Sequence, residues 1–223
     1  KARNVEGLSY DRTIGVDGFR EMIRTNDEDC SAIRTVIHLG ACSSTTEKDE
    51  DFLHDNNFLY TKELCEWSLC NGVRFVYASS AATYGDGKLG MDDKDEEIEK
   101  FQPLNLYGWS KHKFDLLAQK EGWLDQITGL KYFNVYGPNE EHKGDMRSVV
   151  SKAYEQIAKT GRMTLFKSHR PEYRDGEQKR DFIHVNDCVN VNLWFMNKRI
   201  KGIYNVGTSK SSSFNKVANI VIK

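Results

Sequence analysis

The sequence predicts an α/β protein built on a doubly wound parallel sheet. Short β-branched runs alternate with longer segments of helical spacing along most of the chain, and this alternation is typical of parallel strands joined by crossover helices. Right-handed crossovers place helices on both faces of such a sheet. Each unusual polar cluster follows a predicted strand, where open α/β sheets bind their ligands.

The first half of the chain contains two of the predicted strands. Residues 35–41 and 73–78 are short apolar runs with several β-branched side chains, as expected of buried strands. Between them, residues 52–71 place apolar side chains at helical spacing and end at Asn71-Gly72, a common helix terminus. Residues 86–100 are strongly charged and poor in apolar side chains, which indicates a surface loop.

The second half continues the alternation without an internal repeat or a low-complexity linker. Polar and glycine-containing stretches again separate the periodic segments. We predict helices over residues 106–121, 146–160 and 187–197, strands over 129–134, 181–185 and 202–206, and a final helix that begins at Phe214.

The composition argues against several classes of protein. The 223 residues suit one large domain, or one domain with a small lobe. Lys and Arg number 32 and Asp and Glu number 33, so no global basic field favours nucleic acid as a partner. No apolar run approaches the ~20 residues of a membrane span, and residues 1–11 lack the apolar core of a signal peptide.

The cysteines and histidines indicate neither disulfides nor a metal. The five cysteines are odd in number and contain no CxxC pair, so we expect free thiols in a reducing compartment. The six histidines have no spacing typical of metal ligands. We therefore expect a cytoplasmic protein without a metal site.

The chemistry centres on the segment Tyr107-Gly108-Trp109-Ser110-Lys111. Tyr107 and Lys111 are four positions apart and share one face of the predicted helix. A phenol is a poor base at neutral pH, but a neighbouring ammonium favours the phenolate and lowers the phenol pKa. The pair can then remove a hydroxyl proton while hydride leaves the same carbon. If this motif is considered alone, a chance occurrence of tyrosine and lysine on an amphipathic helix is the better-than-even interpretation.

Two further motifs follow predicted strands. Residues 78–85 read ASSAATYG, and a hydroxyl at this strand end can bond a reacting oxygen, for which we choose Ser80. A serine-rich turn that only caps the next segment is the simpler alternative. Residues 132–138 read YFNVYGP, in which Asn134 is placed to contact a substrate and Gly137-Pro138 to make a turn.

These three motifs, in this order and spacing, resemble the extended short-chain dehydrogenase/reductase family. Within it, HLGACSSTTE at residues 38–47 is similar to the ADP-L-glycero-D-manno-heptose 6-epimerases. The similarity extends over nearly the whole chain and includes residues 55–57, 103–105, 142–144, 179–182 and 191–195.

The resemblance implies a doubly wound Rossmann-type sheet with a smaller C-terminal substrate lobe. It also implies an epimerase that inverts C6 of ADP-D-glycero-D-manno-heptose, a nucleotide-diphosphate sugar used to build lipopolysaccharide. The inversion proceeds by transient oxidation and reduction with bound NADP, with NAD as a second possibility. Enzymes of this kind form homo-oligomers, so we expect a homo-oligomer.

The resemblance also implies roles for individual residues. The catalytic groups are the two bases Tyr107 and Lys143, together with Ser80 and Lys111. The cofactor contacts are Lys1, Gly40, Ala41, Cys42, Ser43, Asn56, Lys111, Val135 and Lys143. The substrate contacts are Ser80, Asn134, Asp145, Lys152, Phe166, Lys167, Ser168, His169 and Arg180.

Simpler interpretations exist for three of these residues. Lys143 alone would be a surface lysine in a glycine-flanked loop. Arg180 suits a diphosphate because its planar fork donates two bonds, but a salt bridge to Asp181 or Glu177 is the alternative. Cys42 is interpreted as a small residue packed beneath the cofactor rather than as a reactive thiol.

The chain departs from the family pattern at several points. Asp145 stands where the family usually has serine, and Lys152 stands where some members have histidine. No GxxGxxG loop is present, although such glycines let a backbone approach a pyrophosphate. We therefore expect a chain truncated at both ends. Residues 1–135 form a partial NADP-binding domain, 136–180 mainly the substrate lobe, and 181–223 a return to the first domain and the start of the C-terminal part.

Two other functions stay open. One is a UDP-hexose 4-epimerase or a nucleotide-sugar dehydratase of the same fold. The Ser80-Ala81-Ala82 run lacks the acids typical of dehydratases, and Lys143 exceeds what a simple 4-epimerase needs. The other is a catalytically silent binding module. The joint presence of Ser80, Tyr107, Lys111 and Lys143 argues against it, since fold alone does not decide function.

Overall fold

The computed structural model describes residues 2–165, 167–168, 171–172 and 174–222. Lys1, Phe166 and His169, three of the predicted site residues, lie outside these ranges. The chain divides into two compact units. The first unit comprises Lys1–Lys131 and Asn192–Asn205, and the second comprises Tyr132–Val191 and Val206–Lys223.

The first unit is built on a four-stranded sheet in the order β1-β2-β3-β6. Its strands are β1 (Thr35–His38), β2 (Arg74–Ser80), β3 (Thr128–Tyr132) and β6 (Gly202–Val206). β1 and β2 pair in parallel, with Thr35 opposite Arg74 and His38 opposite Tyr77. This arrangement confirms the predicted α/β fold.

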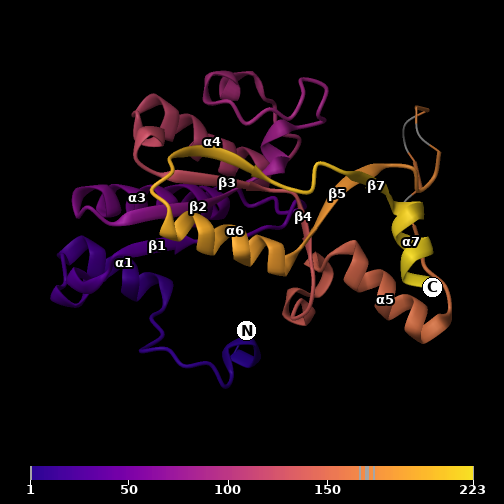
Figure 1. The fold of residues 1–223 in the computed structure, drawn as a ribbon, viewed down its shortest axis with the longest axis horizontal. Coiled ribbons are helices and arrows are strands. Elements are labelled where there is room, and N and C mark those ends of the chain that lie inside the picture. The colour runs from indigo at the N-terminus through magenta and orange to yellow at the C-terminus, as the bar shows by residue number, and fades with distance from the viewer. Residues whose placement is uncertain (1, 166, 169–170, 173, 223) are drawn as a thin grey trace. The chain divides into compact units, whose positions relative to one another are not determined.

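The helices of the first unit begin and end where the sequence supplies caps. The predicted helix over residues 52–71 comprises α2 (Glu50–Leu53), a π-helical turn η3 (His54–Leu59) and α3 (Tyr60–Cys70). The Asp49 carboxylate accepts from the Phe52 N–H at 2.9 Å and caps its start. The predicted helix over 106–121 is α4 (Leu106–Lys120). Figure 1 shows α3 and α4 alongside β2, and both helices contact this strand.

The remaining helical elements are shorter or lie at the chain's turns. α1 (Val16–Thr25) was not predicted, and α6 (Val185–Asn197) begins two residues before its predicted start. The 3-10 segments are η1 (Ala2–Val5), η2 (Glu28–Ala32), η4 (Ala81–Tyr84), η5 (Asp95–Lys100), η6 (Trp123–Asp125) and η7 (Glu141–Met146). No helix of the described residues is long and apolar enough to cross a membrane.

The core of the first unit gathers aromatic and aliphatic side chains around β2 and α4. Phe75, Tyr77 and Phe114 are buried within it, and the rings of Tyr77 and Phe114 meet edge to face. Ile98 joins the same cluster at 1% exposure. The acidic segment over residues 86–100 is therefore more than a surface loop, because its single isoleucine anchors it to the core.

The second unit contains a separate three-stranded sheet in the order β4-β5-β7. β4 (Asn134–Tyr136) pairs in parallel with β5 (Lys179–His184), and β7 (Ser211–Ser213) pairs antiparallel with β5. The predicted strand over 129–134 thus divides, since β3 ends at Tyr132 and Asn134 begins another sheet. The helices are α5 (Val149–Thr160), which Gly161 ends with a φ of 67°, and α7 (Phe214–Ile222).

Candidate active site

The start of α4 carries the predicted tyrosine and lysine. The Asn105 side chain accepts from the Gly108 N–H at 2.8 Å, so the helix begins immediately before Tyr107. A Cβ at position 108 would lie 3.0 Å from the Ala82 carbonyl oxygen and 3.0 Å from Cβ of Pro103. Glycine at this position therefore lets α4 approach η4, the turn that follows Ser80.

The Tyr107 side chain lies within reach of Ser80. Burial raises the pKa of the Tyr107 phenol, and a hydrogen bond with the Ser80 side chain acts in the opposite direction. Ser80 ends β2 and is itself buried, and its hydroxyl also accepts from the Ala82 N–H at 3.1 Å. The structure thus brings together two of the predicted catalytic residues.

Lys111 lies one turn further along α4 and is buried at 4% exposure. Its Nζ has no hydrogen-bond partner within the described part of the chain. Burial lowers the pKa of this ammonium to about 8, while the Asp115 carboxylate acts against that shift. An unpartnered buried ammonium is costly unless a ligand supplies an acceptor, so Lys111 fits a polar cofactor group such as a ribose hydroxyl.

His38 lies beside Lys111 at the end of β1. Burial, and secondarily the charge of Lys111, lower the pKa of His38 to about 3. The His38 Nε2 is 2.9 Å from the Thr61 hydroxyl, which in turn donates to the Asn57 carbonyl oxygen at 2.6 Å. His38 is consequently neutral near pH 7 and adds no second positive charge beside Lys111.

The loop that follows β1 contains the predicted cofactor contacts. Gly40 and Ser43 are exposed, whereas Ala41 and Cys42 are half-buried. The side chain of Asn57 accepts from the Cys42 N–H at 2.8 Å and donates to the Cys42 carbonyl at 2.9 Å. The backbone of this loop is therefore held by a single amide side chain.

Asn57 is a site residue that the sequence interpretation missed, because it selected the neighbouring Asn56. Asn57 lies in the π turn at 0% exposure and also donates to the Ser110 hydroxyl of α4 at 2.9 Å. Asn56 instead donates to the Asn57 side-chain oxygen at 2.9 Å. The signal was available, since two consecutive asparagines are unfavourable inside a helix unless their side chains are used.

Lys143, the second predicted base, lies in the second unit on η7. Its side chain is exposed, and its N–H donates to the Glu140 carbonyl at 2.9 Å. Gly144 has a φ of 53°, which lets the backbone bend directly after Lys143.

Glu140 is a second residue that the sequence interpretation missed. Its buried carboxylate accepts from the Gly137 N–H at 3.1 Å, the Ser148 N–H at 2.6 Å and the Ser148 hydroxyl at 2.7 Å. The two ends of the segment that contains Lys143 are thus tied to one carboxylate, and we name residues 137–148 the lysine loop.

Of the predicted substrate contacts in and around the lysine loop, Asn134 and Asp145 are exposed and Lys152 is half-buried. Asp145 and Lys143 form no ion pair among the described residues, while Lys152 donates to the Asp145 carbonyl at 2.5 Å. Asn134 is exposed and donates to the Asp181 carbonyl at 3.2 Å. Val135 is half-buried in β4.

Arg180 does not form the salt bridges considered as its alternative role. The Asp181 carboxylate instead accepts from Thr208 and Ser209, and the Glu177 carboxylate accepts from Asn215 at 2.5 Å. Arg180 donates to the Lys179 carbonyl, and its side chain is exposed. Lys167 is exposed as well, and the Ser168 N–H donates to Asp175 at 2.7 Å.

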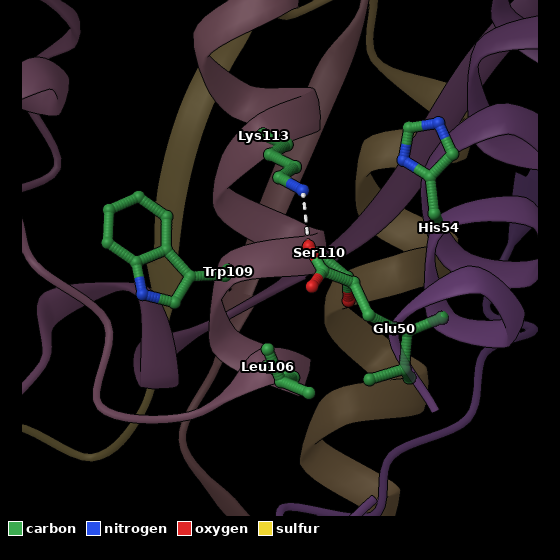
Figure 2. A pocket seen from close by; sticks show the side chains of 7 residues that line it. Glu50, His54, Leu106, Trp109, Ser110 and Lys113 are labelled. Carbon is green, nitrogen blue, oxygen red and sulfur yellow. Dashed lines mark ion pairs between the residues drawn. The ribbon is translucent and has the colours of Figure 1, made fainter. Parts of the chain in front are cut away.

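A small pocket between α2 and α4 does not contain this chemistry. Figure 2 shows the ion pair from Lys113 to Glu50, 3.6 Å long, at this pocket. Neither Ser80, Tyr107 nor Lys111 lines it; the lining residues are Glu50, Leu53, His54, Leu106, Trp109, Ser110 and Lys113. Within the described residues, no group of three His, Cys, Asp or Glu side chains could hold a metal ion.

Residues 20–207 match the NAD dependent epimerase/dehydratase family. The chain belongs to this family. It is 50% identical over 224 residues to an ADP-L-glycero-D-manno-heptose-6-epimerase from Nitratidesulfovibrio vulgaris, covering 100% of this chain and 69% of that relative. The enzyme of the same name from Fusobacterium nucleatum is 47% identical, with 95% of this chain and 64% of the relative covered.

Solved structures agree with this assignment. A Helicobacter pylori ADP-L-glycero-D-manno-heptose-6-epimerase superimposes with a TM-score of 0.83 at 27% identity, covering 98% of this chain and 66% of that chain. A Thermus thermophilus UDP-glucose 4-epimerase in complex with NAD gives 0.75 at 26% identity, covering 99% and 70%. The chain thus spans about two thirds of the length of these relatives. The resemblance to heptose 6-epimerases is confirmed.

Proposed function

We propose that the protein inverts C6 of ADP-D-glycero-D-manno-heptose to give ADP-L-glycero-D-manno-heptose. The observation that carries this proposal is Lys111, buried and unpartnered one turn after Tyr107, whose hydroxyl bonds Ser80. These groups occur in a chain that is 50% identical to a heptose 6-epimerase. The product would serve lipopolysaccharide synthesis in the cytoplasm, and we expect the enzyme to be a homo-oligomer.

In this proposal Tyr107 accepts the proton of the substrate hydroxyl at C6. Burial alone makes the phenol a weaker acid, so the positive charge of Lys111 has to favour the phenolate. Ser80 donates a hydrogen bond to the same substrate oxygen and holds it beside Tyr107. A bound nicotinamide dinucleotide supplies a reversible acceptor for the hydride on C6.

Inversion requires a proton donor and acceptor on the opposite face of C6. Lys143 is our candidate, because it matches the second base of the family and is accessible on the lysine loop. A lysine acts as a base once burial or nearby positive charge lowers its pKa. We therefore expect Lys143 to take this role only when bound substrate covers it. The hydride that leaves C6 would return to its opposite face, and the proton lost from the C6 hydroxyl would be replaced, so the reaction has no net redox change.

The residues that would hold the cofactor come from several segments. Lys111 would bond the ribose, the loop Gly40–Ser43 with Asn56 would pass beneath the dinucleotide, and Val135 and Lys143 would approach the nicotinamide. We propose NADP, with NAD as the second possibility. The first domain, residues 1–135, would carry most of these contacts.

Substrate recognition would use the accessible polar groups of the second unit. Arg180 is available for the diphosphate, since the carboxylates considered as its partners bond other groups. The other proposed contacts are Ser80, Asn134, Asp145, Lys152, Lys167 and Ser168. Residues 136–180 would form most of the substrate lobe; of the predicted return over residues 181–223, Asn192–Asn205 belong to the first unit and the rest belongs to the second.

The complete gene product incubated with ADP-D-glycero-D-manno-heptose tests the proposal. C6 inversion is followed by NMR in the wild type and in Tyr107→Phe and Lys143→Met variants. Inversion in the wild type with severe loss in both variants supports two bases. Inversion that survives Lys143→Met removes the second base only. Turnover of a UDP-hexose without heptose inversion would show that the substrate is a UDP-hexose. If the protein turns over neither sugar and binds no nicotinamide, the alternative of a silent binding module is supported.

A further inference from the structure

We infer that the buried ion pair between Asp115 and Lys131 is a positioning device that holds Ser80 and the Tyr107–Lys111 helix in one arrangement. The inference rests on the proposed function and deepens it. Asp115 is 0% exposed and Lys131 is 1% exposed, and the Lys131 Nζ lies 2.5 Å from an Asp115 oxygen. Both residues belong to the first unit.

The pair is hydrogen-bonded to side-chain hydroxyls of residues on either side of Ser80. Asp115 accepts from the Tyr77 hydroxyl at 2.9 Å and from the Ser79 hydroxyl at 2.7 Å. Lys131 donates to the Thr83 hydroxyl at 2.7 Å, and Thr83 donates to the Ser80 carbonyl at 2.8 Å. The end of β2 and the turn after it are therefore fixed by one charged pair.

The same carboxylate belongs to the helix that carries the proton-transfer residues. Asp115 follows Lys111 by one turn and Tyr107 by two turns of α4, so the three side chains share a helix face. Its negative charge raises the pKa of Lys111 against the effect of burial. The groups that face Lys111 are this carboxylate and the neutral His38 of β1. Asp115 is the negative charge that favours a protonated Lys111.

Packing alone does not explain a charged pair at this place. Two charges that are buried lose their hydration, and their mutual attraction offsets this loss only when the geometry is good. Apolar residues of similar volume often stabilise a protein core equally well. The Asp115–Lys131 pair also orients three hydroxyl groups, those of Tyr77, Ser79 and Thr83. Aliphatic side chains could fill the space but could not bond these hydroxyls.

The backbone opposite the pair is adapted to it. A Cβ at Gly129 of β3 would lie 2.6 Å from the Tyr77 hydroxyl oxygen. Glycine at this position leaves room for the Tyr77 hydroxyl to reach Asp115. The Lys131 ammonium also lies 5.1 Å from the centre of the Tyr84 ring, a cation–π distance.

The test compares Asp115→Asn, Lys131→Arg and the double variant Asp115→Asn with Lys131→Met in the complete gene product. We expect the double variant to fold, because neither partner of the ion pair is left charged, and to lose on the order of tenfold to a hundredfold in kcat through misplacement of reacting groups. Lys131→Arg retains the positive charge beside Asp115, so its kcat should fall less than that of the double variant. Leu124→Ala, in the same core but away from the network, is the matched control for general destabilisation.

The second readout is the pKa of Lys111, measured by NMR titration of carbon-labelled lysine and assigned with Lys111→Arg. It is expected to fall in Asp115→Asn, and the alkaline limb of the kcat profile, on which Lys111 loses its proton, to move to lower pH. A double variant with wild-type kcat, or one that is slowed no more than Leu124→Ala, overturns the inference. So does an unchanged Lys111 pKa in Asp115→Asn. If the wild type does not invert the heptose, only the proposed function is contradicted, because the Lys111 titration needs no substrate.

Discussion

The two proposed bases lie in structurally opposite surroundings. Tyr107 and Lys111 are packed on a helix against a strand end, and buried hydrogen bonds fix the residues around them. Lys143 is exposed on a loop whose two ends are bonded to Glu140. In the proposed mechanism, one half of the proton chemistry would therefore be prepared in the folded chain, whereas the other half would depend on what covers the lysine loop.

The largest effect is expected from removing the prepared base. Tyr107→Phe keeps the ring and its packing but deletes the hydroxyl that bonds Ser80. We expect kcat for inversion to fall about 10²- to 10⁴-fold, the range for a lost general base. The NMR inversion assay measures it, with Tyr154→Phe, an exposed tyrosine of α5, as the control. A loss below tenfold would mean that another group accepts the proton.

Lys111→Met separates catalysis from stability within the prepared half. Activity should fall strongly, while the cofactor-free protein should unfold at a higher temperature, because a buried ammonium without a partner is removed. Calorimetry of the cofactor-free protein at pH 7 measures the second effect. Unfolding at a lower temperature in Lys111→Met would show that the ammonium stabilises the native state.

The sign of the pH effect follows from the direction of the Lys111 pKa shift. The pKa is lowered from 10.5 to about 8 in the folded chain, so the unfolded chain binds more protons between these values. The destabilisation, roughly 3 kcal/mol at full extent, is present below pH 8 and is relieved as the pH rises towards 10.5. The wild type should therefore gain stability over this window relative to Lys111→Met, as compared by denaturant unfolding at pH 7 and pH 10.

Asn57→Ala should reveal how the loop after β1 is held. The variant leaves the Cys42 N–H, the Cys42 carbonyl and the Ser110 hydroxyl without this partner. We expect a loss of about 2–4 kcal/mol in the free energy of unfolding and weaker retention of the dinucleotide. Asn56→Ala, which removes only the neighbouring amide bond, is the control. Equal losses in both variants would contradict the anchoring role of Asn57.

The smallest effect on stability is expected at the lysine loop. Glu140→Gln replaces a carboxylate that accepts three hydrogen bonds with an amide that accepts less well. We expect a loss of about 1–2 kcal/mol in unfolding free energy and a lower kcat. In the Lys143→Met background, Glu140→Gln should cause no further loss of kcat. Glu66→Gln, at the Lys62–Glu66 ion pair of α3, is the control. If the kcat losses of Glu140→Gln and Lys143→Met add in the combined variant, Glu140 does not act through Lys143.

Much of the fold could be predicted because periodic apolar residues leave a clear pattern. α4 and β6 agree with their predicted ranges to within one residue. β7 consists of three serines and has no apolar alternation to read. The division of residues 129–134 between two sheets was missed, since a continuous run does not show where the chain leaves one sheet for another. α1 was overlooked although Phe19, Met22 and Ile23 have helical spacing.

Short motifs that carry their own chemistry were the best guide to the candidate site. Ser80 and Tyr107 are brought together in the structure, and Lys111 lies one turn further along α4. Asn57, Glu140 and the Asp115–Lys131 pair were missed, because a buried polar residue looks like a surface residue until its partners are known. Lys131 could have been noticed in the sequence, because a charged residue inside a predicted buried strand needs a partner of opposite charge.

Because residues His54–Leu59 form a π turn, the number of residues in this helix determines which side chains face the loop after β1. A π turn holds one more residue than an α turn and often occurs at functional sites. Deleting one residue here would restore an ordinary helix and rotate the preceding side chains by roughly 100° relative to those that follow. The helix would persist, but Asn57 could no longer face Cys42 while Thr61 faces His38. A one-residue gap here in an alignment of related chains would therefore mark a change in how the loop after β1 is held.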